Sequence, residues 1–579
     1  MALQMLINLQ SFLQTFTWCT WLGILFLILS VVDYIINKPP KNFPPRPICV
    51  PFLGNIFHLS TKQAHIDMNK LSKTYGEIYS LRLSSTRVVV LCGLNILKEA
   101  LVNQADIFSD RAKLPLLFEL FKGQGLLHSS GTLWKQQRRF ALTTLKNFGL
   151  GKKSLEERIL EEIKHLHVVA EKEKGQPFDP QNMIQTAVAN IIASIVFGDR
   201  FNYSDIEFQE LVCLFAENLT LQSSIWTQPY LPPNPFSCSL TDQSMLGQPF
   251  DPQNMIQTAV ANIIASIVFG DRFNYSDIEF QELVCLFEEN LTLQSSIWTQ
   301  MYNAFPNTMK LLPGPHKKIF RNWEKILQFV KERVQAHKKE WESSCSRDFI
   351  DSYLCEIEKF KGSAVSTFHE DNLCSCAADL FLAGTETTST TLHWGLLYMA
   401  VYPEIQEKVQ AEIDKVVGHG REPRMEDKLN MPYTDAVLHE LQRISNVLPI
   451  SVPRCTNKDT MLGGYFLPKG TIVIPTLTSV LYATNEWETP YVFNPEHFLD
   501  ENGKLKKRDS FVPFSIGKRN CIGEQLTKME LFLFFTSLLQ KFTFQAPKGT
   551  KLSLKVKVGI TLSPLPYKIH AIPRLQSYI

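Results

Sequence analysis

The sequence predicts a mainly α-helical protein with small β-sheets and an apolar helix at its N-terminus. Apolar residues recur at helical spacing through residues 526–535. A second long helix is expected over residues 368–402, where Thr367-x-x-Glu370 has the form of a capping box. Residues 78–83 and 87–92 have the composition of short strands. Long helices with few, short strands indicate this fold class.

The N-terminal segment has the features of an uncleaved membrane anchor. Residues 1–32 carry no charged side chain, and residues 16–32 are the most apolar part. A cleaved signal peptide is the alternative, but no basic region precedes the segment and no small-residue cleavage site follows it. Lys38, Lys41 and Arg46 lie on the C-terminal side, which predicts that this side faces the cytosol. We therefore expect an anchor over 1–37, a proline-rich linker over 38–50 and a large folded domain over 51–579.

Composition excludes several classes of protein. The chain of 579 residues is 45% hydrophobic, which is ample for a large core, and its net charge of +2 gives no basis for nucleic-acid binding. The twelve cysteines are scattered and form no C-x-x-C pair. This pattern argues against a disulfide framework or a zinc site and fits a reducing compartment.

The most distinctive stretch is FSIGKRNCIG, residues 514–523. Cys521 lies between Gly517 and Gly523, and a helical pattern resumes directly after it. The cysteine is therefore expected on a tight loop at a helix N-terminus, where N–H groups and partial positive charge favour a thiolate. Glycines allow backbone to approach a flat cofactor, and a thiolate held in this way suits haem iron. The simpler alternative is that Cys521 is a small buried apolar residue.

Two further patterns lie on predicted helices. Trp134 and Arg138 are four residues apart and share one helix face. Within the helix over 368–402, Ala383-Gly-Thr-Glu-Thr-Thr388 is a poor helix-forming run. The hydroxyl of Thr387 is expected to bond back to the carbonyl of Ala383 and to bend the helix there. Each pattern by itself also fits ordinary packing.

A third pattern joins two distant segments. Glu440 and Arg443 are three residues apart, a spacing that usually gives a surface ion pair of small value. The later segment FNPEHF contains His497. Between them, Arg454 follows a Val-Pro pair.

Together these motifs resemble the cytochrome P-450 haem-thiolate monooxygenases. F-x-x-G-x-R-x-C-x-G, W-x-x-x-R, A-G-x-E-T-T and E-x-x-R occur in the family's order and spacing. The resemblance implies the cytochrome P-450 fold, with small sheets near the N-terminal part, and a haem b cofactor bound by the thiolate of Cys521. Among such proteins, stretches such as FLAGTETTSTTL and PFSIGKRNCIGEQL look most like the second family of animal microsomal enzymes, and in particular its J subfamily of fatty-acid epoxygenases.

The resemblance also assigns roles to residues. Thr387 and Glu386 would deliver protons, and Glu440, Arg443 and His497 would form a buried structural triad. Residues implied at the cofactor are Trp134, Arg138, Arg454, Arg519, Phe514 and Gly523. Residues implied in the substrate pocket are Ala383, Ile450 and Ile560, all apolar.

The implied reaction inserts one oxygen atom of O2 into a lipophilic substrate, by fatty-acid epoxidation or hydroxylation or by xenobiotic oxidation. Electrons would come from NADPH through NADPH-cytochrome P-450 reductase, with cytochrome b5 as a second candidate donor. Basic residues on or after the helix of Trp134 would form the docking face: Lys135, Arg139, Lys146, Lys152 and Lys153. The implied location is the endoplasmic reticulum membrane, with the catalytic domain in the cytosol.

An internal duplication departs from the family pattern. Residues 175–228 recur as 247–300 with one difference, Ala216 against Glu288, and residues 229–246 separate the copies. Removing the offset of 72 residues leaves 507, a length usual for the family. The acid at 288 and the loop that follows it lead us to expect residues 277–291 of the second copy in the second helical position of the core.

Two other functions remain open at this stage. One is a haem-thiolate isomerase that rearranges peroxides without electrons, against which the Thr387–Glu386 pair argues. The other is a non-functional duplicated product that does not bind haem.

Overall fold

The computed structural model describes most of the chain outside the duplicated region. The described residues are 2–60, 63–84, 86–147, 180–196, 302–303, 305–314, 316–340, 348–362, 366–558 and 561–574, with isolated positions between 156 and 178. Ile560, Lys152, Lys153 and the whole second copy lie outside them, as does the side chain of Glu386.

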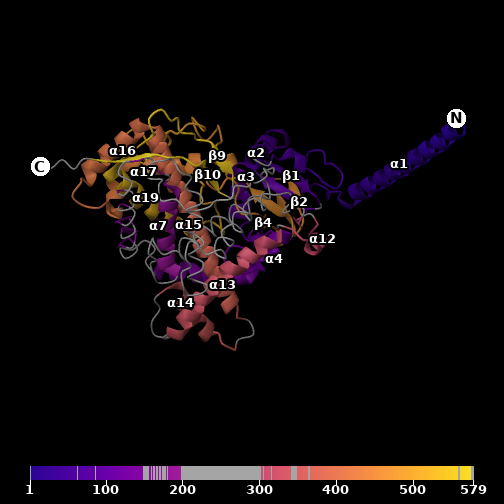
Figure 1. The fold of residues 1–579 in the computed structure, drawn as a ribbon. Coiled ribbons are helices and arrows are strands. Elements are labelled where there is room, and N and C mark those ends of the chain that lie inside the picture. Colours follow the sequence, from indigo (N-terminus) through magenta and orange to yellow (C-terminus); the bar gives the residue numbers. More distant parts are fainter. Residues whose placement is uncertain are drawn as a thin grey trace, which may run out of the picture.

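Helices dominate the described residues (Figure 1). They are α1 (Ala2–Ile36), α2 (Ala64–Tyr75), α3 (Leu94–Lys98), α4 (Pro115–Phe121), α5 (Gly131–Asn147), α7 (Gln181–Val196), α12 (Pro306–Leu311), α13 (His316–Glu340), α14 (Phe349–Lys359), α15 (Glu370–Val401), α16 (Pro403–Val416), α17 (Pro432–Ser445), α18 (Thr478–Leu481) and α19 (Glu524–Lys541). Short turns of 3₁₀-helix are η1 (Ile56–His58), η3 (Met425–Asn430) and η4 (Pro495–Phe498), and η2 (Glu99–Asn103) is a π-helical turn.

The largest sheet in the described part of the chain has the strand order β1-β2-β7-β4-β3. Its strands are β1 (Ile78–Leu83), β2 (Thr86–Leu91), β7 (Ile472–Pro475), β4 (Arg454–Cys455) and β3 (Asp110–Arg111). β2 and β7 pair in parallel, with Val89 opposite Val473, and the other pairs are antiparallel.

Three two-stranded sheets complete the β-structure that is described. They are β5 (Thr460–Leu462) with β6 (Tyr465–Leu467), β9 (Val556–Val558) with β10 (Leu562–Pro564), and β8 (Phe542–Gln545) with β11 (His570–Pro573). The sheet expected near the N-terminal part is present, in β1 and β2, and further strands come from the C-terminal half. The apolar strand β7 leaves the C-terminal half and pairs with β2, because both strands need a partner for their backbone and for their buried Val and Ile side chains.

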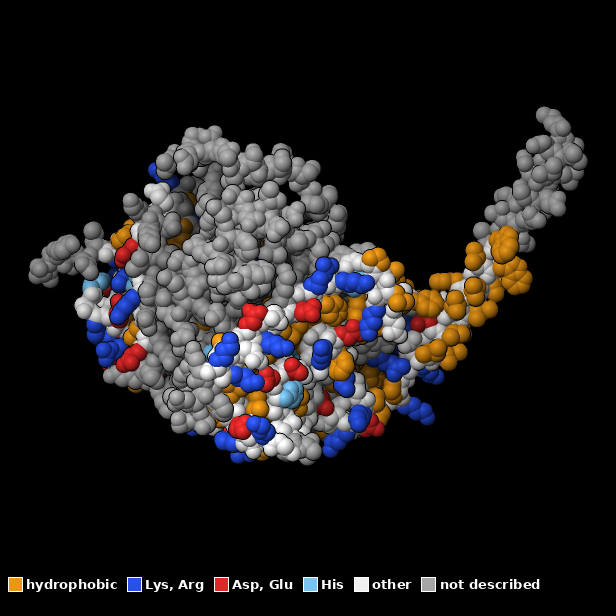
Figure 2. Space-filling view, turned by 60° about the horizontal axis from the view of Figure 1, so that its bottom comes forward, with side chains coloured by type: hydrophobic (Ala, Val, Ile, Leu, Met, Phe, Trp, Pro, Cys, Tyr) orange, Lys and Arg blue, Asp and Glu red, His pale blue; other side chains and the backbone are white. Residues whose placement is uncertain are grey.

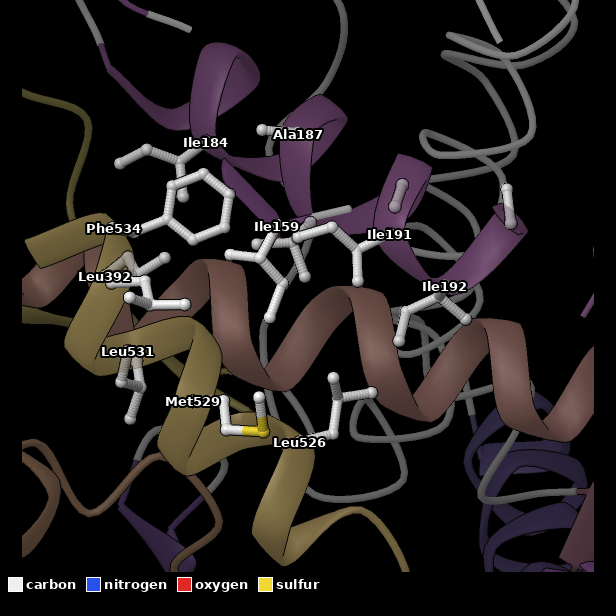
Figure 3. Close-up of a cluster of buried hydrophobic side chains, with 14 of the residues drawn as sticks. Ile159, Ile184, Ala187, Ile191, Ile192, Leu392, Leu526, Met529, Leu531 and Phe534 are labelled. Carbon is white, nitrogen blue, oxygen red and sulfur yellow. The ribbon is translucent and has the colours of Figure 1, made fainter. Parts of the chain in front are cut away.

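α15 is the central helix of the fold. Figure 3 shows it between α7 and α19, with Ile191 and Ile192 on one side and Leu526, Met529 and Leu531 on the other. Small residues allow this close packing. A Cβ at Gly384 would lie 2.6 Å from Ile192 Cδ1 of α7, and one at Gly395 would lie 3.4 Å from Phe535 Cδ2 of α19.

The start of α15 differs from the prediction. The helix begins at Glu370, and its N-cap is His369, whose side chain accepts a hydrogen bond from the Asn372 N–H. The capping box at Thr367 was wrong because the Thr367 hydroxyl is engaged elsewhere. It donates to Gln136 Oε1 and accepts from Gln137 Nε2 on α5.

α1 projects from the body at the N-terminus (Figure 1). Its C-terminal end is tied to the sheet by Asp33, which accepts hydrogen bonds of 2.9 and 2.8 Å from the Arg82 guanidinium. Hydrophobic side chains follow the described part of α1 and the adjoining end of the body (Figure 2), and Trp18 and Trp21 are 71% and 66% exposed. Within the described residues, no helix combines the length and hydropathy that crossing a bilayer requires.

The first copy of the duplicated segment supplies α7. Ile184, Ala187, Ile191 and Ile192 of this helix are buried in the main hydrophobic cluster (Figure 3). The expected placement of residues 277–291 lies outside the described residues. One helical position of the core is thus filled by residues 181–196 of the first copy.

Candidate functional site

The loop that carries Cys521 is closed by its own backbone. The Cys521 N–H donates to the Phe514 carbonyl at 3.0 Å, and the Asn520 N–H donates to the Gly517 carbonyl at 3.1 Å. α19 begins three residues after the cysteine, with Gly523 as its N-cap. The loop therefore delivers the sulfur to a helix N-terminus, as the sequence predicted.

A close backbone approach fixes the same loop from outside. Gly517 has φ +80, and a Cβ there would lie 1.7 Å from the carbonyl oxygen of Leu101 on η2. Only glycine fits without a shift of backbone. The glycine of the motif is thus explained by contact with η2 as well as by the turn.

The Cys521 thiol is accessible from solvent, so a ligand can reach it. The pKa of this thiol is nevertheless raised, chiefly because the surrounding protein withdraws the sulfur from water and also because of the charge of Glu524, while the Gly523 N–H and the charge of Arg138 act in the opposite direction. The helix N-terminus thus contributes the expected N–H group, but the protein groups at the loop do not by themselves outweigh desolvation.

Arginine side chains gather beside this loop. Arg138 donates to the carbonyl and side-chain oxygens of Asn520, both at 2.8 Å. Arg519 donates from Nε to the Ser109 carbonyl at 2.8 Å, and Arg111 donates from Nε to the Leu127 carbonyl at 2.8 Å. Arg454 lies 3.3 Å from Ser515 Oγ. Arg111, Arg454 and Arg519 are buried. The four guanidinium groups are called the arginine cluster below.

The arginine cluster lacks enough negative charge of its own. Burial and repulsion from its neighbours lower the pKa of Arg519 to about 7, that of Arg111 to about 9 and that of Arg454 to about 10. The buried Nε of Arg454 has no hydrogen-bond partner among the described residues. Buried cations with an open donor are stabilised by an anion. The cluster therefore fits a ligand with more than one carboxylate, as haem has.

Trp134 contributes in a way that the sequence did not show. It is buried on α5, and the guanidinium of Arg519 lies 3.9 Å from the centre of its ring. The sequence predicted that Trp134 and Arg138, on one helix face, both lie at the cofactor. In the structure the Trp134 ring also supports the arginine of the cysteine loop, so the two motifs form one unit.

The predicted bond within α15 is present. Thr387 Oγ1 donates to the Ala383 carbonyl at 2.8 Å, and Ala383 is exposed. α15 is nevertheless continuous from Glu370 to Val401. Ile450 is half-buried and forms a single bridge with Thr476.

An acidic residue of α15 holds the loop beside the arginine cluster. Asp379 is buried, and its Oδ2 accepts from the N–H groups of Leu126 and Leu127 at 2.7 and 2.8 Å. Asn372 Oδ1 accepts from the Gly125 N–H at 2.9 Å. Burial raises the pKa of Asp379 to about 7, against the two N–H groups and Arg111. Residues 125–127, whose carbonyls bind Arg111 and Arg519, are thus clamped to α15.

The three predicted structural residues meet in the core. Arg443 donates to both oxygens of Glu440 at 2.7 Å, and His497 Nδ1 lies 3.1 Å from Glu440 Oε2. All three are essentially fully buried. Arg508 donates from Nε to the His497 carbonyl at 2.9 Å, which links the triad to the segment that leads into the cysteine loop.

The sequence reasoning missed Arg111, Asn520 and Asp379. Asn520 and Asp379 lie inside or next to recognised motifs, but a side chain's target is not visible in one sequence. Arg111 lies in a segment without a motif and reaches the site because β3 pairs with β4, placing Arg111 opposite Arg454.

Comparison with known proteins places the chain in a family. The model of the family described as cytochrome P450 matches residues 44–246 and 239–571. The chain belongs to the cytochrome P450 family. The two matched pieces overlap within the segment that separates the duplicated copies.

Relatives extend over nearly the whole chain. Cytochrome P450 2J2 of Homo sapiens is 46% identical over 94% of this chain and 94% of its own length. Cytochrome P450 2J1 of Oryctolagus cuniculus is 47% identical over 95% and 96%. Cytochrome P450 2C23 of Rattus norvegicus is 40% identical over 92% and 94%. The chain thus lies close to the 2J members of the family.

Family membership decides the class of reaction. The protein is a haem-thiolate monooxygenase that uses dioxygen and a lipophilic substrate, and a cysteine thiolate is the axial ligand of its haem. This assignment is favoured over a peroxide isomerase or a non-functional product. The P450 fold and the mainly helical architecture with small sheets agree with it.

Proposed function

We propose that Cys521 is the axial ligand of the haem. The observation that carries this assignment is the closed loop at the N-terminus of α19, with the accessible thiol next to the arginine cluster. Phe514 accepts the hydrogen bond that closes the loop, and Gly523 leaves room beside the sulfur, since a Cβ there would lie 4.0 Å from Sγ.

The arginine cluster and Trp134 hold the cofactor's carboxylates. Arg138, Arg454 and Arg519 bind them as the resemblance implied, and Arg111 is added because it is buried in the same cluster. Neighbouring arginines lower the pKa of Arg111, Arg454 and Arg519, and two carboxylates would offset this repulsion. Trp134 supports the Arg519 guanidinium, which lies over its ring.

Proton delivery is the role of Thr387 with Glu386. When bound, haem supplies the activation of dioxygen and the insertion of one oxygen atom into the substrate. The Thr387 hydroxyl already donates to the Ala383 carbonyl, so it can accept a hydrogen bond from water or another hydroxyl. The Thr387 hydroxyl can therefore form part of a path for protons at the exposed face of α15.

The substrate is a lipophilic molecule, oxidised by fatty-acid epoxidation or hydroxylation or as a xenobiotic. Ala383, Ile450 and Ile560 line its pocket, and their apolar side chains favour such a ligand. Similarity to the 2J proteins supports the fatty-acid alternative.

Electrons come from NADPH-cytochrome P-450 reductase, with cytochrome b5 as a second donor. The supporting observation is a basic exposed face of α5, to which Lys135, Arg139 and Lys146 contribute. Complementary charge on such a face steers an acidic partner and sets its orientation.

The enzyme is anchored in the endoplasmic reticulum membrane by residues 1–37, with 38–50 as a linker and 51–579 as the cytosolic catalytic domain. The exposed apolar side chains of α1 support this arrangement, because water gives them no partner to bury against. Deleting residues 1–38 is expected to move protein from microsomal membranes to the soluble fraction without loss of haem. Equal partitioning of the truncated and full-length proteins would contradict the anchor.

The ligand assignment is tested by Cys521→Ala, with Cys355→Ala on α14 as the matched control. We expect the alanine variant at 521 to lose the thiolate type of spectrum in its reduced, carbon-monoxide-bound form, together with activity. The control is expected to keep both. A thiolate spectrum retained by Cys521→Ala would refute the assignment.

A further inference from the structure

A groove lies between α4, α13 and the start of α15. Its cavity volume is about 430 Å³, within the range of about 300–1,000 Å³ that small-molecule sites occupy in proteins. All three helices line it, for example through Phe121 of α4, Trp323 of α13 and Cys374 of α15. None of the described residues that line it is assigned above to the haem or to the substrate pocket. The groove is therefore a separate cavity whose role is open.

The buried side of the groove is apolar. The Trp323 ring stands edge-on to Phe121, with ring centres 4.6 Å apart and ring planes at 72°. Both rings are buried, and the partly buried Phe320 and Leu327 continue the apolar surface along α13. Aromatic and aliphatic side chains of this kind favour the apolar body of a ligand, because contact with it removes apolar surface from water.

Two of the acids that line the groove are already compensated. Glu119 pairs with Lys310 and accepts a hydrogen bond from the Tyr302 hydroxyl. Asp371 lies in the first turn of α15, where the partial positive charge of a helix N-terminus stabilises a carboxylate. Neither acid therefore offers an open partner to a cation.

The remaining charged groups leave an excess of positive charge. They are Lys122, Lys331 and Glu324, and all three are exposed. None of them forms an ion pair with another residue in the described part of the chain. Two lysines against one acid favour an anionic group on the ligand. The groove thus combines an apolar wall with a cationic rim.

The Phe121 ring also connects the groove to the haem site. It stacks on His128, with ring centres 3.9 Å apart and ring planes at 9°. His128 belongs to the loop 125–129, whose carbonyls accept hydrogen bonds from Arg111 and Arg519. A ligand that orders Phe121 therefore also orders the loop that holds two members of the arginine cluster.

We propose that this groove is a second ligand site, which takes a lipophilic carboxylate such as a fatty acid. The hydrocarbon chain lies against Phe121 and Trp323, and the carboxylate pairs with Lys331 and Lys122. Occupancy holds the stack on His128 in place and so slows the loss of haem. The site itself does not depend on the roles proposed at the haem, whereas the effect on haem rests on the arginine cluster holding its carboxylates.

Binding is measured with laurate by equilibrium dialysis, in full-length holoenzyme whose iron is saturated with clotrimazole so that the haem side is occupied. Lys331→Glu is expected to raise the Kd for laurate at least about tenfold, because a hydrogen bond to a charged group is lost and a like charge is added. The matched control is Lys339→Glu, at an exposed position of α13 outside the lining, which should bind laurate like the wild type. Dodecan-1-ol has no carboxylate, so the wild type and Lys331→Glu should bind it equally.

The place of binding is tested with laurate that carries a photoreactive diazirine at the end of its chain. Peptides that contain residues 119–124 or 320–331 should be labelled. Gln328 is exposed and lines the groove, so Gln328→Trp should fill the groove and abolish this labelling without lowering the melting temperature.

The effect on the haem site is measured, without clotrimazole, as the rate at which haem passes from the enzyme to apomyoglobin. Saturating laurate should slow this rate in the wild type but not in Gln328→Trp, because a ligand stabilises the state that binds it. His128→Ala should still bind laurate in the groove but lose the slowing. Arg111→Gln tests the proposed cluster separately: if it does not speed haem loss, the role of the cluster fails, whatever laurate does.

Unchanged laurate affinity in Lys331→Glu would overturn the site, as would labelling confined to other peptides. A weaker affinity of Lys331→Glu for dodecan-1-ol as well would overturn the recognition of a carboxylate. Equal slowing of haem loss in the wild type and His128→Ala would overturn only the connection through Phe121.

Discussion

At the scale of single residues, the site depends on positions that tolerate only one type of residue, in one case glycine. Gly517 is the clearest, because the carbonyl of Leu101 occupies the space of a Cβ. Arg519 is a second, since it spans the Ser109 carbonyl and the Trp134 ring. Both lie inside the cysteine motif, four and two residues before Cys521, so the motif encodes contacts to other elements as well as the ligand.

Gly517→Ala is expected to destabilise the protein by more than about 3 kcal/mol, since a positive φ and a backbone clash add together. The matched control is Gly549→Ala, where φ is +77 but no atom lies within 4 Å of the added Cβ. That change should cost only about 1 kcal/mol of backbone strain. Haem content and melting temperature measure the difference, and equal effects would show that the contact with Leu101 is unimportant.

At the scale of elements, two buried polar contacts hold the halves of the site together. The triad joins α17 and η4 and reaches the cysteine segment through Arg508. Asp379 joins α15 to the loop whose carbonyls bind Arg111 and Arg519. Both place charge where water is excluded, so removing one partner leaves the other uncompensated.

Glu440→Ala is expected to cost about 3–5 kcal/mol and to abolish haem incorporation, because the Arg443 charge is left buried. The control is Glu358→Ala. Its partner Lys361 has the same three-residue spacing, but the Lys361 and Glu358 side chains are 74% and 54% exposed. Exposed pairs of this kind contribute little, so the control should match the wild type in haem content and thermal unfolding. A mild Glu440 variant would contradict the structural role of the triad.

The raised pKa of Asp379 predicts that the stability of the folded protein depends on pH. Its pKa is raised from 3.8 in the unfolded chain to about 7 in the folded protein, so the folded state binds the proton more tightly. This contribution is fully present below about pH 4 and is lost as pH rises through about pH 7. The unfolding free energy of the wild type relative to Asp379→Asn should therefore fall over that window. Asparagine keeps an acceptor for Leu126 and Leu127, and a flat difference curve would mean that Asp379 does not titrate as described.

At the scale of the whole molecule, the duplication gives the chain two nearly identical segments for one helical position in the core. The structure uses the first copy for α7, which packs on α15 through the approach at Gly384. Figure 3 shows α7 lying along α15, with Ile191 and Ile192 facing it. The second copy repeats the apolar residues of α7 in its sequence, so we expect an aggregation risk wherever such residues are left outside a core.

Deleting residues 229–300 is expected to give a 507-residue enzyme with equal or better haem incorporation and thermal stability. The matched variant lacks residues 175–246 and retains the second copy. The two products have the same sequence except for Ala216 in the first and Glu288 in the second. Any difference in haem incorporation or thermal stability between the two products is therefore due to the residue at that single position. If both deletions lowered haem content and stability, the extra segment would be an integrated part of the fold.

The sequence by itself determined the class of fold, the family and the chemistry of the centre. Cys521 could be recognised because its loop is local: turn residues, glycines and the following helix all lie within a few positions. The same holds for the hydroxyl bond from Thr387 to Ala383, which spans one helical turn. Contacts inside one element follow from spacing along the chain.

Tertiary structure decided which distant side chains meet. Arg111 lies opposite Arg454 through strand pairing, the Trp134 ring supports Arg519, and the hydroxyl of Thr367 bonds to α5 instead of capping α15. The placement of β7 beside β2 is of the same kind. These contacts depend on how helices and strands pack, and one sequence without its fold does not record which polar groups the interior brings together.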